Sequence, residues 1–294
     1  MRAPQLVTTT DLALYGRTAS DSAAVVINRY STSFGWASAL LPRRTRTHIA
    51  RIYALVRVAD ELVDGPGAAA GLAADELHAL LDALERETLA AIERGFSTNL
   101  VVHAFALTAR EHGIGAPLIA PFFASMRADL DGEPRAGDEL DAYIFGSAEV
   151  VGLMCLAVFE HGRTRTGAEQ ATLEEGARSL GAAFQKVNFL RDIAADRDEL
   201  GRRYVPGGGR ELTERAKTAQ LDDIRADLAA ADRAIPLLDR GSRPAVWAAR
   251  AFFGALADRI DRTPAAVVAR ERVRVPNGEK AGILARALLR RWTR

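Results

Sequence analysis

Two pairs of aspartates have the residue type and the spacing of a cation site. Asp60 and Asp64 stand four residues apart, and Asp192 and Asp196 repeat that spacing. On a helix, this spacing places both carboxylates of a pair on one face, one turn apart. Carboxylate oxygens suit hard cations such as Mg²⁺, which commonly bridges to phosphate groups. If the fold brings the pairs face to face, they predict a diphosphate held through Mg²⁺.

The first pair belongs to a polar stripe on an otherwise apolar segment. Tyr53, Arg57, Asp60 and Asp64 share one helical face of residues 43–63, and most of their neighbours are apolar. Such a stripe must be solvated, paired or bound to a ligand. Taken alone it also fits a surface face, because charged side chains are mostly exposed.

A second stripe favours a bound ligand over an ordinary surface face. Gln185, Asn188, Asp192 and Asp196 share one face of residues 168–198, and nearly every other direction of that segment is apolar. A helix that is apolar over most of its circumference is expected at the centre of a protein, so this stripe should face an internal cleft. No histidine lies near either aspartate pair, which argues against a zinc or a di-iron site.

Two arginines stand beside the acidic stripes. Arg57 and Arg191 could contact phosphate oxygens, which a guanidinium binds through paired N–H donors. They could equally form structural salt bridges to Asp60 and Asp192. The sequence leaves both interpretations open.

Helical periodicity runs through almost the whole chain, and no alternating apolar pattern predicts a confident strand. An all-α fold is therefore expected. Helices are predicted over about 20–30, 43–63, 73–94, 97–111, 117–130, 138–159, 168–198, 213–238, 244–260 and 279–292. Gly95 should end a helix, and Ser97 and Thr213 are candidate N-caps. The absence of a linker or internal repeat favours one domain over residues 1–294, in which residues 1–19 can be flexible.

Composition narrows the class of protein. The 39 basic and 38 acidic residues nearly cancel, which argues against a nucleic-acid partner. The single cysteine, Cys155, lies in an apolar run and is interpreted as a buried core thiol. The five histidines are scattered and are interpreted as surface or satisfied residues. No stretch is judged long and apolar enough to span a membrane, so a cytoplasmic location is expected.

With both aspartate pairs in view, the chain resembles the squalene/phytoene synthase family, the head-to-head prenyltransferases, over about residues 29–286. Bacterial and plant phytoene synthases look most similar, because Asp-Glu-Leu-Val-Asp-Gly-Pro and Asn-Phe-Leu-Arg-Asp are typical of them. The resemblance rests on six ordered segments: Tyr30-Ser31-Thr32-Ser33-Phe34, Tyr53 to Asp64, Tyr143 to Gly152, Gln185 to Asp196, Gly201 to Pro206, and Arg272 to Asn277.

The resemblance implies a single isoprenoid-synthase-type helical bundle around a central apolar cleft. It implies that Mg²⁺, with Mn²⁺ as a substitute, is held by Asp60, Asp64, Asn188, Asp192 and Asp196. The residues it assigns to substrate binding are Tyr30, Ser31, Thr32, Ser33, Tyr53, Arg57, Gln185, Arg191, Arg202 and Tyr204. Besides the four aspartates, it assigns Phe34 and Tyr143 to catalysis, where an aromatic face can stabilise a carbocation.

The implied reaction joins two geranylgeranyl diphosphates head to head. One allylic diphosphate ionises, its cation attacks the second substrate to give a cyclopropylcarbinyl diphosphate, and rearrangement yields phytoene for carotenoid biosynthesis. The alternative is a synthase that uses farnesyl diphosphate and makes squalene, presqualene diphosphate or diapophytoene. A non-catalytic scaffold is disfavoured because all four aspartates are present, and no nicotinamide cofactor is expected because no dinucleotide fingerprint occurs.

Three further expectations concern the apolar part of the site and the product. Phe252 stands where the family often has tyrosine, so the aromatic face is kept and the hydroxyl is not. Phe34, Phe145 and Val150 are expected to set the length of the substrate chain. An oily product suggests peripheral membrane contact through Leu284, Leu288 and Trp292, although an ordinary helix packed on the bundle fits the same pattern.

Overall fold

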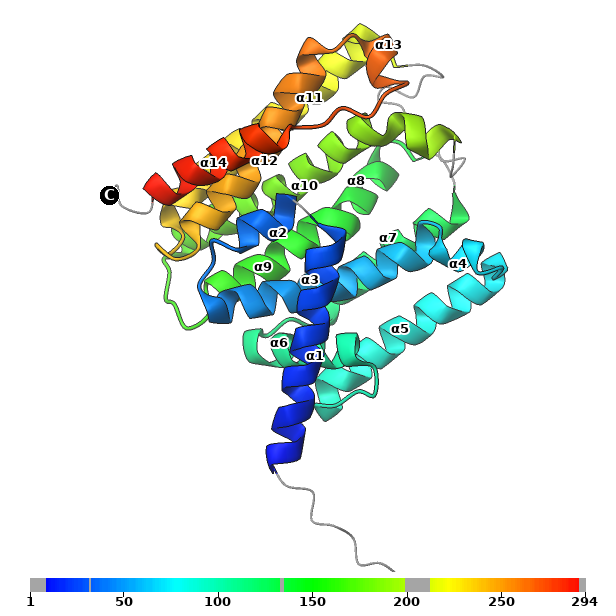
Figure 1. Ribbon diagram of the computed structural model, residues 1–294, viewed down its shortest axis with the longest axis vertical. Helices are drawn as coiled ribbons and strands as arrows, with labels where there is room; N and C mark the ends of the chain where they lie inside the picture. Colours follow the sequence, from blue (N-terminus) through cyan, green and yellow to red (C-terminus); the bar gives the residue numbers. More distant parts are fainter. Residues whose placement is uncertain (1–8, 32, 133–134, 199–211, 291–294) are drawn as a thin grey trace, which may run out of the picture.

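The computed structural model describes residues 9–31, 33–132, 135–198 and 212–290, with only the backbone described for Thr9 and residues 194–198. In these residues every regular element is helical, which confirms the predicted all-α fold (Figure 1). The α-helices are α1 (Thr9–Tyr30), α2 (Ser33–Ser38), α3 (Arg43–Val63), α4 (Pro66–Ala69), α5 (Ala74–Arg94), α6 (Leu100–His112), α7 (Ala116–Asp131), α8 (Asp138–Ile144), α9 (Val150–Phe159), α10 (Gly167–Asp198), α11 (Glu214–Ala234), α12 (Arg243–Arg262), α13 (Ala265–Val268) and α14 (Asn277–Arg290). A π-helical turn (Phe145–Glu149) joins α8 to α9, and a 3₁₀ turn (Ile235–Leu237) follows α11.

Local sequence signals explain several helix ends. Thr213 caps α11 by accepting a hydrogen bond from the Ala216 amide at 3.1 Å, as predicted. Gly95 ends α5 in the left-handed conformation, with a φ of 80°. The prediction for α6 was wrong: Asn99, and not Ser97, caps this helix, through its side-chain oxygen to the amide of Val101 at 3.0 Å. Ser97 lies in the preceding turn, where its hydroxyl bonds to a neighbouring carboxylate.

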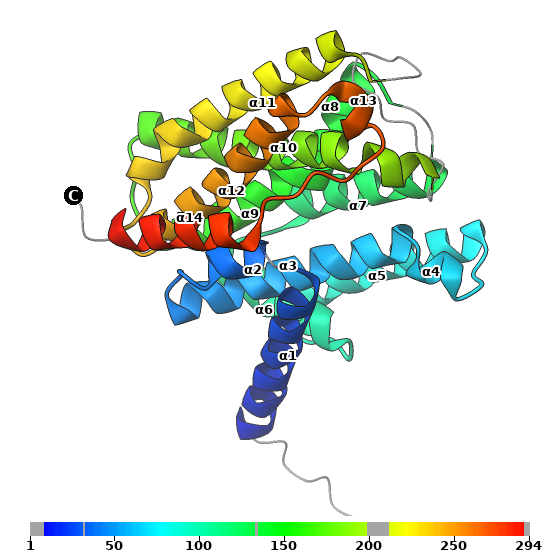
Figure 2. The ribbon, with the colours of Figure 1, turned by 45° about the horizontal axis from the view of Figure 1, so that its top comes forward.

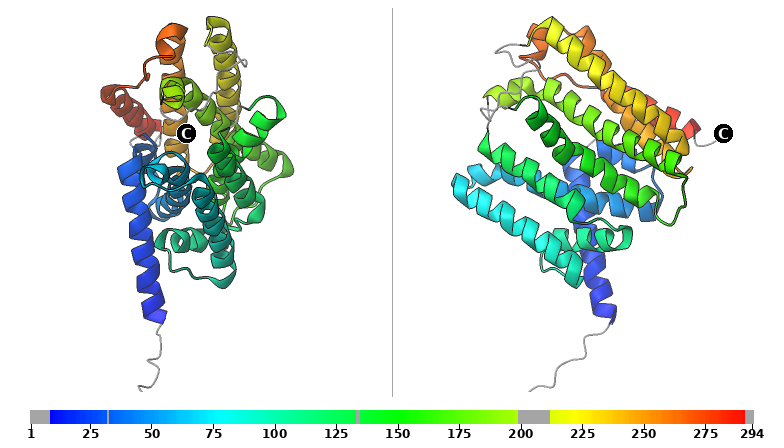
Figure 3. Two further views of the ribbon diagram at one scale, coloured as in Figure 1. Left: turned by 90° about the vertical axis from the view of Figure 1, so that its right-hand side faces the viewer. Right: turned by 180° about the vertical axis from the view of Figure 1, so that it is seen from behind.

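Helix α1 begins at Thr9, so residues 9–19 are helical where a flexible segment was predicted. Ala19 and Ala23 are fully buried and pack with Ala54 of α3 and Ala104 of α6, because small side chains let these helices approach closely. The first turns of α1 project away from the bundle (Figures 1 and 3), and Leu12 is 51% exposed. These first turns bury little and carry no amphipathic pattern, which is why periodicity did not predict them.

The bundle is built around two apolar clusters of buried side chains. The first joins α3, α5, α6, α7 and α9, and the second joins α10, α11, α12 and α13. Figure 2 shows α3 and α5 on one side and α10, α11 and α12 on the other, with α9 between them. A cavity between these two halves is lined from both, and the central cleft implied by the resemblance is therefore confirmed.

The helix through Asp138–Phe159 is the central element of this arrangement. It packs against α3, α7 and α10. A Cβ added at Gly152 would lie 2.3 Å from the Ala177 carbonyl oxygen, and one at Gly181 would lie 2.5 Å from that of Ala148. Only glycine at these two positions allows α9 and α10 to pack so closely. Their proximity brings the second acidic stripe next to the cavity.

The same helix is long and apolar enough to cross a membrane by length and composition, with a mean hydropathy of 1.9. The sequence expectation that no stretch reaches this length was therefore wrong. This criterion is also met by core helices, and this helix has neighbouring helices on several sides.

The last helix, α14, packs against α12 and α2. Ile283 and Ala287 are buried there and Leu284 packs beside them, while Leu288 is 47% and Leu289 is 68% exposed. The apolar face predicted for membrane contact is therefore not continuous, because Leu284 packs against the bundle and Leu288 is exposed to solvent. Trp292 lies outside the described residues.

Candidate active site

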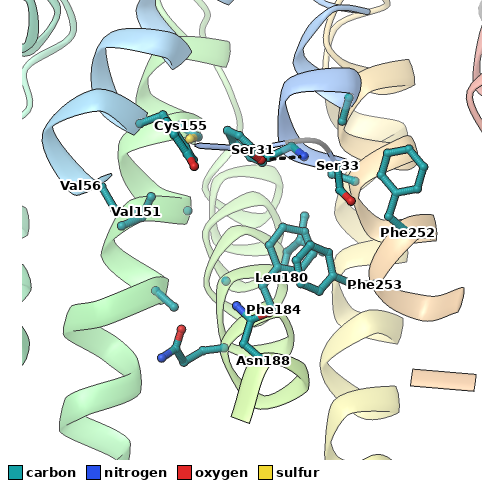
Figure 4. Close-up of a pocket in the computed structure, with 18 of the residues that line it drawn as sticks. Ser31, Ser33, Val56, Val151, Cys155, Leu180, Phe184, Asn188, Phe252 and Phe253 are labelled. Atoms are coloured by element: carbon teal, nitrogen blue, oxygen red, sulfur yellow. Dashed lines mark hydrogen bonds between the residues drawn. The ribbon is translucent and has the colours of Figure 1, made fainter. Parts of the chain in front are cut away.

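One cavity of about 1180 Å³ lies between the two halves of the bundle (Figure 4). It is lined by every residue that was predicted to bind metal or substrate or to act in catalysis and whose side chain is described. These residues are Tyr30, Ser31, Ser33, Phe34, Tyr53, Arg57, Asp60, Asp64, Tyr143, Gln185, Asn188, Arg191 and Asp192. Thr32, Arg202, Tyr204 and the side chain of Asp196 lie outside the described part of the chain.

The acidic stripes of α3 and α10 meet at this cavity. Asp60 and Asp64 stand at the C-terminal end of α3, and Asn188 and Asp192 stand on α10. The sequence prediction that the second stripe faces an internal cleft is confirmed for Asn188 and Asp192. The two stripes are 121 residues or more apart in the chain, so only the packing of α3 and α10 brings them to one site.

Both arginines beside the stripes form ion pairs with the aspartates. Arg57 Nη1 lies 3.6 Å from Asp60 Oδ2, and Arg57 also pairs with Glu61. Arg191 Nε donates to Asp192 Oδ1 at 2.9 Å, and Arg272 Nε lies 2.9 Å from the same oxygen. The salt-bridge interpretation therefore describes this structure. Because these arginines also line the cavity, an anion bound there could take over their N–H donors.

The segment after α1 forms an aromatic side of the cavity. Phe34 and Tyr53 stack with ring centroids 5.6 Å apart, and the Arg57 guanidinium lies 4.8 Å from the centre of the Tyr30 ring. The Ser31 hydroxyl accepts a hydrogen bond from the Phe34 amide at 3.1 Å, drawn as the dashed line in Figure 4. Burial raises the pKa of Tyr53, so its hydroxyl stays protonated at neutral pH.

A polar network that the sequence did not predict holds Tyr143. Its hydroxyl donates to Asp129 Oδ2 at 3.0 Å, and Gln185 Nε2 donates to the same hydroxyl at 3.5 Å. The Arg135 guanidinium lies 4.3 Å from the centre of the Tyr143 ring and 3.4 Å from Asp129. Asp129 is 7% exposed, and an acid in an apolar helix such as α7 was the signal available in the sequence.

The far wall of the cavity is apolar. It is lined by Val151, Leu180, Phe184, Phe252 and Phe253 (Figure 4). The rings of Phe184 and Phe253 stack, with their centroids 3.7 Å apart. Phe252 is 3% exposed, so the aromatic face expected at this position is present in the wall.

Cys155 packs against the first apolar cluster, as predicted for a core thiol, and also belongs to the wall of the cavity, which the sequence did not predict. Its side chain is part of the cavity lining. Burial raises the pKa of the thiol to about 12, because the thiolate would be poorly solvated. The thiol is accordingly neutral at physiological pH.

Two residues predicted to set chain length do not line the cavity. Val150 is fully buried in the first apolar cluster, and Phe145 lies at a separate small pocket with Arg178 5.4 Å from its ring centre. The π-helical turn at 145–149 explains the error at Val150, because its wider turn changes which later residues share a face with Tyr143. Phe145 is two residues after Tyr143, a spacing that puts the two side chains on opposite sides of a helix. Val151 and Cys155 take the positions that Val150 was expected to hold.

Further cationic groups that were not predicted from the sequence stand at the cavity. Arg272 and Lys280 both line it. Burial, and secondarily the Arg191 guanidinium, lowers the pKa of Lys280. Arg272 belongs to a segment that carries the family resemblance, and this was the signal available for it. The cavity lining thus combines several acids with cations that include Arg57, Arg191, Arg272 and Lys280.

The donor set at the mouth fits a hard cation. The ligands are oxygens, from the carboxylates of Asp60, Asp64 and Asp192 and the amide of Asn188. Asn188 Oδ1 is buried and accepts no hydrogen bond from the protein. A buried oxygen without a donor is costly unless a ligand satisfies it, so this atom suits a metal-ligand position.

Comparison with known proteins identifies the family to which this chain belongs. The profile of squalene/phytoene synthases matches residues 27–279. The chain belongs to the squalene/phytoene synthase family. It is accordingly a prenyltransferase, as the aspartate motifs indicated.

Related family members have several activities. Phytoene synthase from Mycobacterium tuberculosis is 31% identical over 279 residues, covering 87% of this chain and 86% of the relative. Presqualene diphosphate synthase from Rhodopseudomonas palustris is 29% identical, covering 82% and 79%. Among solved structures, a dehydrosqualene synthase in complex with a ligand has a TM-score of 0.76 at 20% identity, covering 94% of this chain and 98% of its own. A squalene synthase from Alicyclobacillus acidocaldarius has a TM-score of 0.71 at 22% identity, covering 85% and 95%. These structures share the isoprenoid-synthase fold with this chain.

Proposed function

We propose that the chain condenses two geranylgeranyl diphosphates head to head, through a cyclopropylcarbinyl diphosphate, to phytoene in carotenoid biosynthesis. The observation that carries this proposal is one cavity of about 1180 Å³ that combines charged residues with an apolar wall. That volume exceeds the ~300–1,000 Å³ of ordinary small-molecule pockets, as two long prenyl chains require. The similarity to phytoene synthases supports the choice of product.

The mouth of the cavity would bind the diphosphates. Asp60, Asp64, Asn188 and Asp192 would hold Mg²⁺, or Mn²⁺ in its place. The bound ion would act as a Lewis acid that neutralises charge on the departing diphosphate. Arg57 and Arg191 would exchange their present carboxylate partners for phosphate oxygens.

The wall of the cavity would protect the carbocations from water. Its apolar and aromatic side chains exclude hydroxyl nucleophiles from the reacting carbons. Phe34 and Tyr143 present ring faces that can stabilise positive charge. The neutral Cys155 thiol adds little nucleophilicity, because its pKa of about 12 keeps thiolate scarce.

A second candidate activity uses farnesyl diphosphate and makes presqualene diphosphate, squalene or diapophytoene. The similarity to presqualene diphosphate synthase and to dehydrosqualene synthase favours it. The same charged mouth would serve either substrate, so the apolar wall would have to discriminate between them.

Incubation of the purified chain with Mg²⁺ and each prenyl diphosphate tests these activities. We expect diphosphate release and a C40 hydrocarbon from geranylgeranyl diphosphate, identified by mass spectrometry. A C30 product from farnesyl diphosphate alone would establish the second candidate. No diphosphate release with either substrate would refute both.

We also propose that the enzyme works in the cytoplasm at the surface of a membrane, into which an oily product can leave. Leu288 and Leu289 are exposed on α14, and Arg290 follows them. Apolar side chains beside basic residues suit an anionic lipid surface. Co-sedimentation with anionic liposomes tests this contact, and a Leu289→Glu variant should weaken it.

A further inference from the structure

A group of histidines lies away from the cavity, at the opposite end of α3 from its aspartates. His48 is in the second turn of α3, His112 ends α6, and His161 follows α9. The ring centroids of His48 and His112 are 4.5 Å apart, and those of His112 and His161 are 4.6 Å apart. The interpretation of these histidines as scattered residues was therefore wrong, since three helices bring them together.

Glu111 completes a possible ligand set with two of these rings. Its Oε2 lies 3.7 Å from His48 Nε2, and its Oε1 lies 4.0 Å from His112 Nε2. One ligand atom from each of His48, Glu111 and His112 lies within 4.8 Å of the others. One ion could contact all three after small side-chain movements.

The polar atoms of His112 give an independent reason to expect a ligand. Its side chain is 4% exposed, and neither Nδ1 nor Nε2 makes a hydrogen bond within the protein. A buried polar atom without a partner costs about 1–3 kcal/mol. Such atoms in a native fold are often satisfied by a bound ion or water.

The surroundings of His48 favour metal binding through Nε2. Its Nδ1 lies 3.0 Å from Thr108 Oγ1, which also accepts from Arg51 Nη1 at 3.4 Å. If Nδ1–H donates to the remaining lone pair of that oxygen, Nε2 presents its lone pair toward Glu111, as metal-ligating histidines commonly do. Arg44 donates to Glu111 Oε1 at 2.5 Å, and this positions Oε2 near His48.

We propose that His48, Glu111 and His112 bind a divalent transition-metal ion such as Zn²⁺. Two imidazoles and a carboxylate suit Zn²⁺ far better than Mg²⁺, which prefers oxygen ligands. His161 is the nearest further imidazole for a fourth position. None of these residues lines the diphosphate cavity.

The ion would be structural, because it would join the start of α3 to the end of α6. His48 and Asp60 are twelve residues apart on one helix, a distance of about 18 Å at ~1.5 Å per residue. The metal would stabilise the helix that carries the first aspartate pair without entering the reaction. This inference does not depend on the proposed substrate.

Titration with Co²⁺, a spectroscopic substitute for Zn²⁺, tests the site in the full chain. The protein is first treated with EDTA and then saturated with Mg²⁺ to occupy the aspartates. We expect one equivalent of Co²⁺ to produce visible d–d absorption that Zn²⁺ abolishes, and Zn²⁺ to raise the midpoint of thermal unfolding. Asp60→Asn should keep the absorption, which distinguishes this site from the cavity.

Two ligand variants and a matched control locate the ion. Glu111→Gln and His112→Gln should each weaken Co²⁺ binding at least about tenfold, since even outer ligands contribute this much. His78→Gln removes a histidine that contacts Asp131 instead, and it should bind Co²⁺ like the wild type. Circular dichroism checks that each variant is folded.

A measurement on the wild type decides the question if the variants do not fold. Zn²⁺ should shift the ¹⁵N resonances of at least two histidine rings in Mg²⁺-saturated protein, and leave that of His78 unchanged. Unshifted histidine resonances, or Co²⁺ absorption unaffected in folded Glu111→Gln and His112→Gln, would overturn the proposal.

Discussion

Asn188→Leu should make the protein more stable and the enzyme less active. The side chain has nearly the same size in both residues, and Asn188 Oδ1 is buried without a hydrogen-bond donor in the protein. Leucine removes this unsatisfied oxygen and fills the space with apolar atoms. If the oxygen is retained as a metal ligand, stability and turnover must change in opposite directions.

The size of the stability change follows from the oxygen's environment. An unsatisfied buried acceptor costs about 1–3 kcal/mol, and the variant recovers part of this. One kcal/mol shifts the unfolding midpoint by about 2–4 °C in domains of 150–250 residues. Metal-free Asn188→Leu should therefore unfold up to ~10 °C above the wild type. Turnover should fall roughly 10–100-fold, as for loss of other metal contacts.

Gln185→Leu is the matched control on the same helix and the same cavity. Its amide nitrogen already donates to the Tyr143 hydroxyl at 3.5 Å, so the substitution removes a contact and should not raise the unfolding midpoint. Thermal unfolding of metal-free protein and diphosphate release at several Mg²⁺ concentrations are the two measurements. A lower unfolding midpoint for Asn188→Leu, or an unchanged Mg²⁺ dependence of turnover, would refute the reasoning.

Three other predictions follow from the cavity. Asp60→Asn or Asp192→Asn should lower turnover at least about 100-fold, a loss of ~3 kcal/mol in transition-state stabilisation. Circular dichroism should show that the variants still fold, and near-wild-type rates would show that these acids do not belong to the site. Val151→Phe should shift the product toward shorter chains, because Val151 lines the wall of the cavity, and mass spectrometry measures the product length. Phe145→Leu, which lies outside the cavity, should leave the product length unchanged. The pKa of Cys155, raised from 9.0 to about 12, predicts alkylation by iodoacetamide at pH 8 about 1000-fold slower in the folded than in the unfolded protein. Equal alkylation rates in the folded and unfolded protein would contradict the burial of the thiol. The raised pKa also contributes to the free energy of unfolding: this contribution is complete below about pH 9 and is lost as the pH rises toward 12.

Much of the fold could be predicted because the sequence signals for a helix lie within the helix itself or at its ends. The limits of α3 and the cap of α11 at Thr213 agree with the prediction, since apolar spacing and capping residues act within one or two turns. The start of α1 could not be predicted in the same way. Its first two turns bury little, and a helix without a buried face has no amphipathic pattern to detect.

The site was predictable where one helix face carries several polar residues, and not where single residues meet across helices. Asp60 and Asn188 were identified from their stripes and both line the cavity. Asp129 was missed because it is one acid in an apolar helix, and its partner Tyr143 is 14 residues away. Val150 was misplaced because a π-helical turn rotates the face that follows it, and residue spacing assumed a regular α-helix.

By itself, the sequence determined the helical class, the two acidic stripes and the family. All of these depend on residues within a few turns of one another or on ordered motifs. The tertiary structure alone decided that Asp192 pairs with Arg272, that Cys155 faces a cavity, and that His48 meets His112. These contacts join helices distant in the chain, and they depend on packing that glycines such as Gly152 permit. Local spacing cannot specify which faces of two helices will meet, because that depends on the close packing of all their neighbours at once.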